Sequence, residues 1–163
     1  MIDYISIPKE RIDILKKNKN FLESIEKMCN AKIDLNDEVM ISCDDAIMLL
    51  RLKNVFKAFG RGFDVNDSLK LLDEDYFFES IEVKDYAGKS RSRQVVLKGR
   101  VIGREGKIKK ILERECNVKI AIYGKTISII GKWNDVQLAK KAIEMLLEGK
   151  KHSSLYRFLD RSR

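Results

Sequence analysis

The sequence predicts an α+β protein made of two copies of one small unit, each ordered strand, helix, helix, strand, strand, helix. Two observations support this prediction. A gapless offset of 87 residues aligns residues 14–35 with residues 101–122, and both stretches contain Cys-Asn, then an apolar residue, then Lys-Ile. In each copy the apolar spacing changes from helical to alternating in the same order. Two copies at this long period indicate a duplicated domain rather than a solenoid.

The composition fits two small globular domains. The chain has 163 residues, of which 44% are apolar and 36% charged, and it contains one proline and nine glycines. This length accommodates two domains of about 75 to 85 residues, each near the lower size limit for a self-sufficient core. No apolar run approaches the roughly 18 residues of a membrane-spanning helix, and the N-terminus lacks the pattern of a secretory signal. We therefore expect a cytoplasmic protein.

The first unit is expected to begin with a strand at residues 4–7 and a short helix after Pro8. A helix around residues 21–28 follows, then strands at 32–35 and 39–42, and a long helix from about 45 to 59. Residues 67–72 are expected to form a further short helix. The predicted boundaries are a first domain at 1–66, a linker with this short helix at 67–78, and a second domain at 79–163.

The second unit repeats this plan with one addition. A strand near residues 79–84 precedes the segment AGKSRSRQVVL, which the first copy lacks and which we expect to lengthen the first helix. Ile108, Ile111 and Leu112 mark one face of the next helix. Residues 118–122 and 127–129 alternate as two strands around a turn at 123–125. An amphipathic helix is then predicted from Asp135, ending at Gly149.

Charge separates the two halves of the chain. Residues 1–75 carry 12 Lys and Arg against 15 Asp and Glu, whereas residues 76–163 carry 21 against 10. The first half therefore has a net charge of −3 and the second of +11, which together give the formal charge of +8. Such an asymmetry is a signal of a binding partner rather than of a fold.

Cysteine and histidine offer no metal or catalytic site. Cys29, Cys43 and Cys116 are odd in number and lack Cys-x-x-Cys spacing, so neither a zinc site nor a disulfide framework is predicted, and we expect buried thiols. His152 is the only histidine, and its neighbours predict a polar turn. We therefore expect no cofactor and no metal.

The basic half contains Gly103 and Gly106 between two predicted helices, within the stretch KGRVIGREGK at 98–107. Glycines at these positions let the backbone approach phosphates without a Cβ in the way. The start of the next helix adds unpaired N–H groups and the positive end of the helix dipole. Arg104, Lys107 and Lys110 supply charge, and we expect Val101, Ile102 and Ile108 to line an apolar groove for unstacked bases. A plain helix–helix turn is the alternative for so short a motif.

The first copy has KKNK at residues 16–19, with lysines at both positions that correspond to the glycines. Side chains would then stand between the backbone and a phosphate, and the surrounding half is acidic. We expect this unit to serve protein contacts, with weak RNA contact through its lysines as the alternative.

The element order with Ile-Gly-x-x-Gly-x-x-Ile between two helices resembles the type I KH domain, a three-stranded sheet packed on helices. The resemblance implies RNA binding, because a KH domain clamps four nucleotides with its GXXG loop. The stretches GRGF at 60–63, LLDEDYFFESIEVKDYAGKSRSR at 71–93, YGKTISIIG at 123–131 and AIEMLLEGKKHSSLYRFLDR at 142–161 extend the likeness to the whole chain.

These stretches together resemble the Dim-two family, also called partner of Nob, of archaeal and eukaryotic ribosome assembly factors. The resemblance implies two tandem KH domains and single-stranded RNA binding near the 3′ end of small-subunit rRNA, within a pre-ribosomal particle. It also implies the Nob endonuclease and a translation initiation factor subunit as partners. Archaeal members often carry the glycine loop in the first domain too, from which this chain departs.

The RNA-binding residues predicted on these grounds surround the glycine loop and the segment before it. They are Lys89, Arg91, Arg93, Lys98, Arg100, Val101, Ile102, Gly103, Arg104, Glu105, Gly106, Lys107, Ile108 and Lys110. A solvated basic loop is the alternative for residues 89–93. We expect no catalysis, because a metal-dependent nuclease needs several converging acids and the acids of the basic half are scattered. The alternative functions are a KH-type regulator of mRNA and an RNA-processing enzyme.

Overall fold

The computed structural model describes residues 1–162, and the chain divides into two compact units. The first unit spans Met1–Glu74 and the second begins at Asp75. The expected short helix near residue 67 is present as α4, Val65–Leu69, continued by a 3₁₀ turn at Lys70–Leu72, and both pack against the long helix of the first unit. The first strand of the second unit begins at Tyr76.

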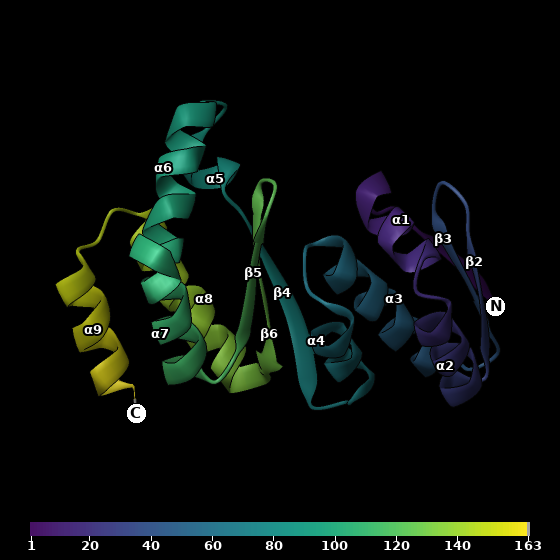
Figure 1. Cartoon of the computed structure of the whole chain (residues 1–163). Coiled ribbons are helices and arrows are strands. Elements are labelled where there is room, and N and C mark those ends of the chain that lie inside the picture. Colours follow the sequence, from purple (N-terminus) through teal and green to yellow (C-terminus); the bar gives the residue numbers. More distant parts are fainter. Residues whose placement is uncertain (163) are drawn as a thin grey trace. The chain divides into compact units, whose positions relative to one another are not determined.

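The first unit has a three-stranded antiparallel sheet in the order β1-β3-β2, with the helices α1 to α3 on one face (Figure 1). Alternate residues of its strands, such as Ile33 and Ile41, point toward the helices and are buried. Its elements are β1 Ile2–Ile5, α1 Lys9–Lys16, α2 Lys19–Cys29, β2 Ala31–Leu35, β3 Val39–Cys43 and α3 Ala46–Gly60.

The first strand lies two residues earlier than the sequence predicts. It was expected at residues 4–7 but occupies Ile2–Ile5, and Pro8 directly precedes α1. Ile7 is buried for a different reason, because it packs against α3 at Gly60. A Cβ at Gly60 would lie 2.5 Å from Cγ2 of Ile7, so the glycine lets the two segments meet. Ile7 is therefore apolar because it contacts a helix, and it is not part of the strand.

The second unit has the same sheet, in the order β4-β6-β5, and the expected extra helical segment. The strand expected near residues 79–84 begins earlier, at Tyr76, because all seven residues pair with β6. The elements are β4 Tyr76–Glu82, α5 Lys84–Ala87, α6 Arg91–Ile102, a 3₁₀ turn at Arg104–Gly106, α7 Lys107–Cys116, β5 Lys119–Tyr123, β6 Thr126–Lys132, α8 Trp133–Leu147 and α9 His152–Arg161.

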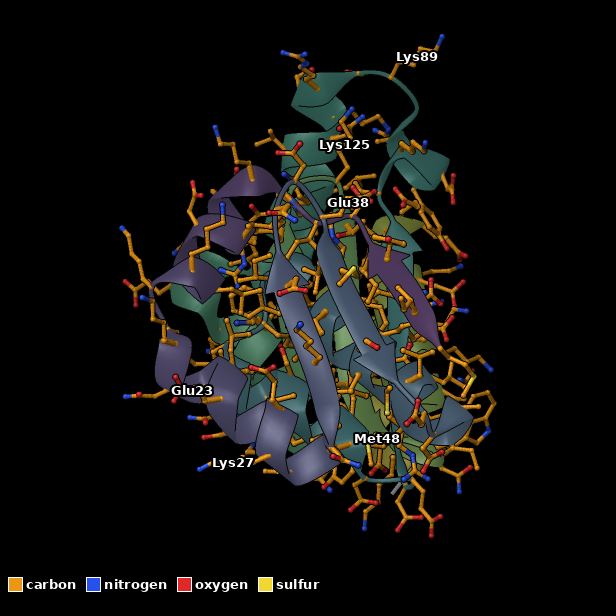
Figure 2. All side chains as sticks on the ribbon, turned by 90° about the vertical axis from the view of Figure 1, so that its right-hand side faces the viewer. Glu23, Lys27, Glu38, Met48, Lys89 and Lys125 are labelled. Atoms are coloured by element: carbon orange, nitrogen blue, oxygen red, sulfur yellow. The ribbon has the colours of Figure 1, made fainter. Side chains whose placement is uncertain are left out.

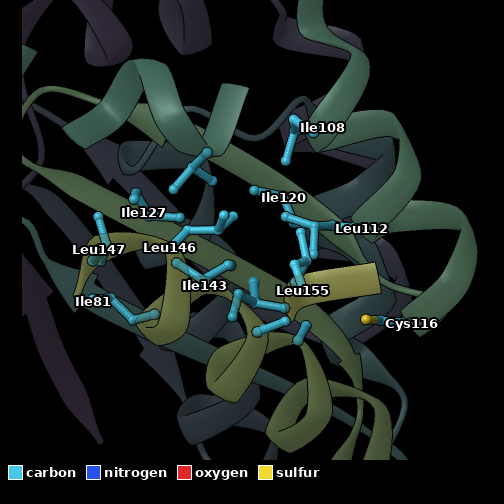
Figure 3. Packing of buried hydrophobic residues seen from close by; sticks show 14 of the residues in the cluster. Ile81, Ile108, Leu112, Cys116, Ile120, Ile127, Ile143, Leu146, Leu147 and Leu155 are labelled. Carbon is cyan, nitrogen blue, oxygen red and sulfur yellow. The ribbon is translucent and has the colours of Figure 1, made fainter. Parts of the chain in front are cut away.

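The core of the second unit lies between the sheet and helices α6 to α8, and α9 packs against α8 (Figure 1). Ile108 and Leu112 of α7 meet Ile120 of β5, Ile143 of α8 and Leu155 of α9 in one buried cluster (Figure 3). The polar turn expected around His152 is wrong, because His152 begins α9. Leu155 and Leu159 fall on one face of that helix and are buried, which is enough to fold a polar sequence against α8.

The two units share side-chain bonds as well as topology. A carboxylate oxygen of Glu26 accepts a hydrogen bond from the Ile33 N–H at 3.3 Å, and Glu113 accepts one from Ile120 N–H at 3.0 Å. Each pair is separated from its counterpart by the same 87 residues, which supports duplication of the whole unit.

The ends of α2 and α7 also correspond. Asn30 and Asn117 follow them in the left-handed conformation, with φ of 49° and 56°, and each caps its helix. Cys29 and Cys116 are the last residues of these helices and are buried, as predicted, together with Cys43. Burial raises the pKa of Cys116 to about 11, and it also raises the pKa of Cys29. Both thiols are therefore packing groups.

Across residues 1–162, no helix combines the length and apolar character needed to cross a membrane. The same part of the chain contains no group of three or more Cys, His, Asp or Glu side chains arranged to hold a metal ion.

Candidate nucleic-acid interface

The loop between α6 and α7 has an unusual backbone. Gly103 ends α6 with φ of 76° and ψ of 174°, Glu105 has φ of 57°, and Gly106 has φ of 74°. Three of the four loop residues thus occupy conformations that favour glycine. Glu105 adopts its left-handed conformation as a non-glycine residue, at a cost of about 1 kcal/mol. The glycines permit a tight turn that leaves the middle of the loop exposed.

The two glycines have different roles. A Cβ at Gly103 would lie 2.4 Å from Cγ1 and 2.8 Å from the backbone nitrogen of Ile108, so this glycine lets the loop fold back on the first turn of α7. A Cβ at Gly106 would meet nothing within 4 Å. Gly106 therefore leaves open space beside its Cα, although its N–H donates to the Gly103 carbonyl at 3.2 Å, whereas Gly103 sets the shape of the turn.

The N-terminus of α7 is open to a ligand. Its N-cap residue is Gly106, and no side chain caps the helix, while the Lys107 N–H donates to the Arg104 carbonyl within the loop. The first-turn N–H groups of a helix lack intrahelical partners and carry the positive end of the dipole, which favours an anion. Arg104, Lys107 and Lys110 are exposed and lie within four residues of this end along the chain. The arrangement can bind a phosphate through backbone N–H groups and through cations together.

Two of the three apolar residues expected to line a groove are in the core instead. Val101 is fully buried and Ile108 is 4% exposed, and both belong to the central cluster of the second unit. They face inward because the helices that flank the loop must pack on the sheet. Ile102, with 37% of its side chain exposed, is the one of the three that a base can touch.

A surface stripe on α6 was missed by the sequence reasoning. Val95 is 64% exposed, Gly99 is exposed with open space around its Cα, and Ile102 follows one turn later. The spacing i, i+4, i+7 places the three on one face of the helix. This spacing is visible in the sequence once the helix is known, and it gives an apolar path that leads to the glycine loop.

Arg100 and Lys98 are engaged within the protein. The Arg100 guanidinium donates to the carbonyl of Leu146 at 2.9 Å and to the carbonyl of Lys150, so it caps the C-terminal end of α8. The Lys98 ammonium donates to the Gly124 carbonyl at 2.8 Å and holds the β5–β6 turn. Both side chains thus support the fold, and both remain partly exposed, so their contact with RNA stays a prediction.

Lys89, Arg91 and Arg93 lie at the other end of α6 from the loop. The expected helix is present, and its N-terminus is capped by Ser90, whose hydroxyl accepts from Arg93 N–H at 3.3 Å. A twelve-residue helix is about 18 Å long, so these cations lie about that distance from Gly103. Lys89 projects outward just before the helix begins (Figure 2). The predicted residues therefore form two separate cationic groups joined by the α6 surface.

The corresponding turn of the first unit is built differently. Lys16 is the last residue of α1, and Asn18 is the N-cap of α2, where its side chain accepts a hydrogen bond from Phe21 N–H at 3.4 Å. The helix end that is open in the second unit is thus occupied by a side chain here. Lys16, Lys17 and Lys19 are exposed around it.

The element order, the sheet topology and the glycine loop define a protein of the KH class, type I. The family model of the second PNO1 KH domain, a eukaryotic-type KH domain (KH-domain type I), matches residues 77–163. The chain belongs to the Dim2/PNO1 family.

Relatives of known sequence support this membership. A KH domain-containing protein of Methanocaldococcus jannaschii is 36% identical, with 99% of this chain and 74% of the relative covered. The RNA-binding protein pno1 of Drosophila melanogaster is 32% identical, with 93% of this chain and 67% of the relative covered.

Solved structures agree with the sequence relatives. Dim2p from Pyrococcus horikoshii OT3 superposes with a TM-score of 0.86 at 34% identity, covering 99% of both chains. A second structure from the same organism, a complex of a/eIF2alpha, aDim2p and rRNA, matches with a TM-score of 0.89 at 32% identity, covering 99% of this chain and 93% of the other.

Proposed function

We propose that this protein is an RNA-binding assembly factor of the small ribosomal subunit that holds single-stranded RNA near the 3′ end of its rRNA. The observation that carries the proposal is the Gly103–Gly106 loop, which joins an open backbone and an uncapped helix end in the basic half of the chain. The names of relatives support it, because they include RNA-binding proteins and pre-rRNA-processing proteins. The rRNA in the P. horikoshii complex supports the same class of ligand.

The RNA path that we propose runs from the loop along α6. The loop cations Arg104 and Lys107, with Lys110 on α7, bind phosphates, while Ile102 and Val95 offer apolar contact to bases. Lys89, Arg91 and Arg93 extend the phosphate contacts at the far end of α6, about 18 Å away. Glu105 lies in the middle of the loop, where its backbone rather than its carboxylate faces the RNA.

We further propose that the first unit, a degenerate KH domain without GxxG, makes protein contacts. Its capped α2 and its acidic balance make it a poor surface for phosphates. The a/eIF2alpha subunit in the complex with aDim2p supports a translation initiation factor subunit as one partner. The Nob endonuclease is the second partner that we propose, within a pre-ribosomal particle. The compartment that we propose for this protein is the cytoplasm.

Catalysis is not part of the proposal, because the loop consists of groups that bind rather than react. Purified protein incubated with a labelled rRNA 3′ fragment and Mg²⁺ or Mn²⁺ should leave the RNA intact. Cleavage that depends on the metal and on the protein would contradict this and would favour the RNA-processing enzyme.

Crosslinking in cells, followed by sequencing of the bound RNA, tests the target. We expect crosslinks concentrated at the 3′ end of the small-subunit rRNA and lost when Arg104 is changed to Glu. Crosslinks spread over many mRNAs would instead identify a KH-type regulator of mRNA.

A further inference from the structure

A second cationic surface lies between α8 and α9, apart from the glycine loop. The two helices flank an open hollow of about 400 Å³, lined by Met145, Lys150, Ser154, Arg157, Phe158 and Arg161. None of these residues is among the predicted RNA contacts. The lining contains three cations and no carboxylate.

The three cations are available to a ligand. Lys150, Arg157 and Arg161 are exposed, and within residues 1–162 none of them forms an ion pair with an Asp or Glu. Arg157 and Arg161 are four residues apart and so share one face of α9. Leu155 and Leu159 fix the helix from its opposite face, because both are buried in the core. Arg157 and Arg161 thus project from a helix that is anchored in the core.

The floor of the hollow is apolar. Phe158 is partly buried, packs against the core, and has the ammonium of Lys141 5.7 Å from its ring centroid. Met145 lies beside it on α8. An aromatic ring flanked by cations matches a nucleotide, whose base or ribose packs on the ring while its phosphate meets the cations.

The hollow is connected to the end of α6 that carries the glycine loop. The guanidinium of Arg100 binds the carbonyls of Leu146 and Lys150, which frame the segment leading into α9. Arg100 is three residues before Gly103, less than one helical turn. A strand clamped at the glycine loop therefore has a cationic surface next to it that is fixed to the same helix end.

We propose that the α8–α9 hollow is a second RNA contact, which binds the sugar-phosphate backbone beside the nucleotides held at Gly103–Gly106. This inference rests on the proposed RNA-binding function and extends the footprint from the loop to the C-terminal helix. RNA is favoured over an acidic peptide because the hollow combines an aromatic floor with cations and adjoins the glycine loop.

The test compares RNAs of two lengths from the 3′ end of the small-subunit rRNA, one of about six nucleotides and one of about twenty. In the full chain, Arg157→Gln with Arg161→Gln should weaken binding of the longer RNA about tenfold and leave the shorter RNA unchanged. The slope of log K against log salt for the longer RNA should fall by about 1.4, since each lost phosphate contact removes about 0.7 for a single strand.

Two control variants separate charge and position. Arg157→Lys with Arg161→Lys keeps the charges and should keep the salt slope. Lys27→Gln with Lys32→Gln removes the same charge from exposed positions of the first unit, where Lys27 points outward from α2 (Figure 2), and should change neither RNA. Glutamine has a helix propensity similar to that of arginine, so the thermal melt of the Arg157→Gln/Arg161→Gln variant should match that of the unmodified protein.

The outcomes distinguish the two proposals. If the longer RNA binds the Arg157→Gln/Arg161→Gln variant as tightly as the unmodified protein, the hollow is not an RNA contact, and an acidic peptide becomes its better occupant. If Arg104→Glu leaves binding of the short RNA unchanged, the proposed function of the glycine loop fails, whatever the α8–α9 variant does.

Discussion

The two units place different structures at one position of the repeat. Lys16 to Lys19 connect α1 to α2 through a turn whose Asn18 side chain accepts a hydrogen bond from the next helix. Gly103 to Gly106 connect α6 to α7 through a turn with three residues at positive φ and no side-chain cap. The first turn caps its helix with a side chain, whereas the second has no side-chain cap and leaves space at the helix end for a ligand.

The two units differ in this turn but share the contacts that surround it. Both units keep the Glu-to-strand hydrogen bond, the left-handed Asn after the second helix and the buried Cys that ends it. The fold thus depends on these shared contacts and tolerates either turn. A duplicated domain can accordingly lose or keep a phosphate site without changing its core.

The largest effect should come from Gly103→Ala. Its Cβ would lie 2.4 Å from Ile108 Cγ1, and its φ of 76° with ψ of 174° is a region populated almost only by glycine. We expect the free energy of unfolding to fall by about 3 kcal/mol. Urea denaturation followed by circular dichroism measures it.

Lys16→Ala at the matching position of the first unit is the control for this prediction. Lys16 is exposed in the last turn of α1, so the change should stay within about 0.5 kcal/mol. Equal stability of the two variants would show that Gly103 does not shape the turn by packing.

Removal of the shared hydrogen bond should affect both units alike. Glu26→Ala and Glu113→Ala each delete a carboxylate acceptor for a strand N–H, which is expected to cost about 2 kcal/mol. Glu23→Ala, on the exposed face of α2 (Figure 2), serves as the control and should change stability by less than about 0.5 kcal/mol. A loss of stability in only one of the two glutamate variants would mean that this hydrogen bond does not play the same part in both units.

The smallest effects should have opposite signs at Asn18 and Glu105, which correspond in the repeat. Asn18→Ala removes the cap of α2 and should lower the free energy of unfolding by about 1 kcal/mol. Glu105→Gly relieves a left-handed residue and should raise it by less than about 1 kcal/mol, since glycine also gains entropy when unfolded. Thermal melts of both variants provide the comparison, and a destabilising Glu105→Gly would contradict it.

Local patterns predicted much of this fold. The repeat and the order of elements follow from periodicity, and the glycine spacing located the turn between α6 and α7. The first strand was predicted two residues too late. Ile7 is apolar because it packs against Gly60 on α3, and no local sequence pattern reveals that contact. The helix at His152 was missed because its buried face has two leucines amid polar residues.

The site was predicted in outline but not in the roles of its residues. Val101 and Ile108 are apolar next to the loop, and sequence alone does not tell a core position from a groove position. Arg100 reads as one more cation, yet its partners Leu146 and Lys150 are nearly fifty residues away along the chain. Such long-range pairing emerges only when the helices are packed.

The most direct test of the difference between the turns is the affinity for a single-stranded fragment of the rRNA 3′ end after charge reversal at matched positions. Arg104 and Lys17 are 87 residues apart, both are exposed, and each follows the first residue of its turn. We predict that Arg104→Glu weakens binding at least tenfold, or about 1.4 kcal/mol, because it places an acid beside the open end of α7. Lys17→Glu should change the affinity less than about twofold, a fraction of 1 kcal/mol. An equal loss from both substitutions would contradict the account, because the capped turn would then bind RNA as well as the open one.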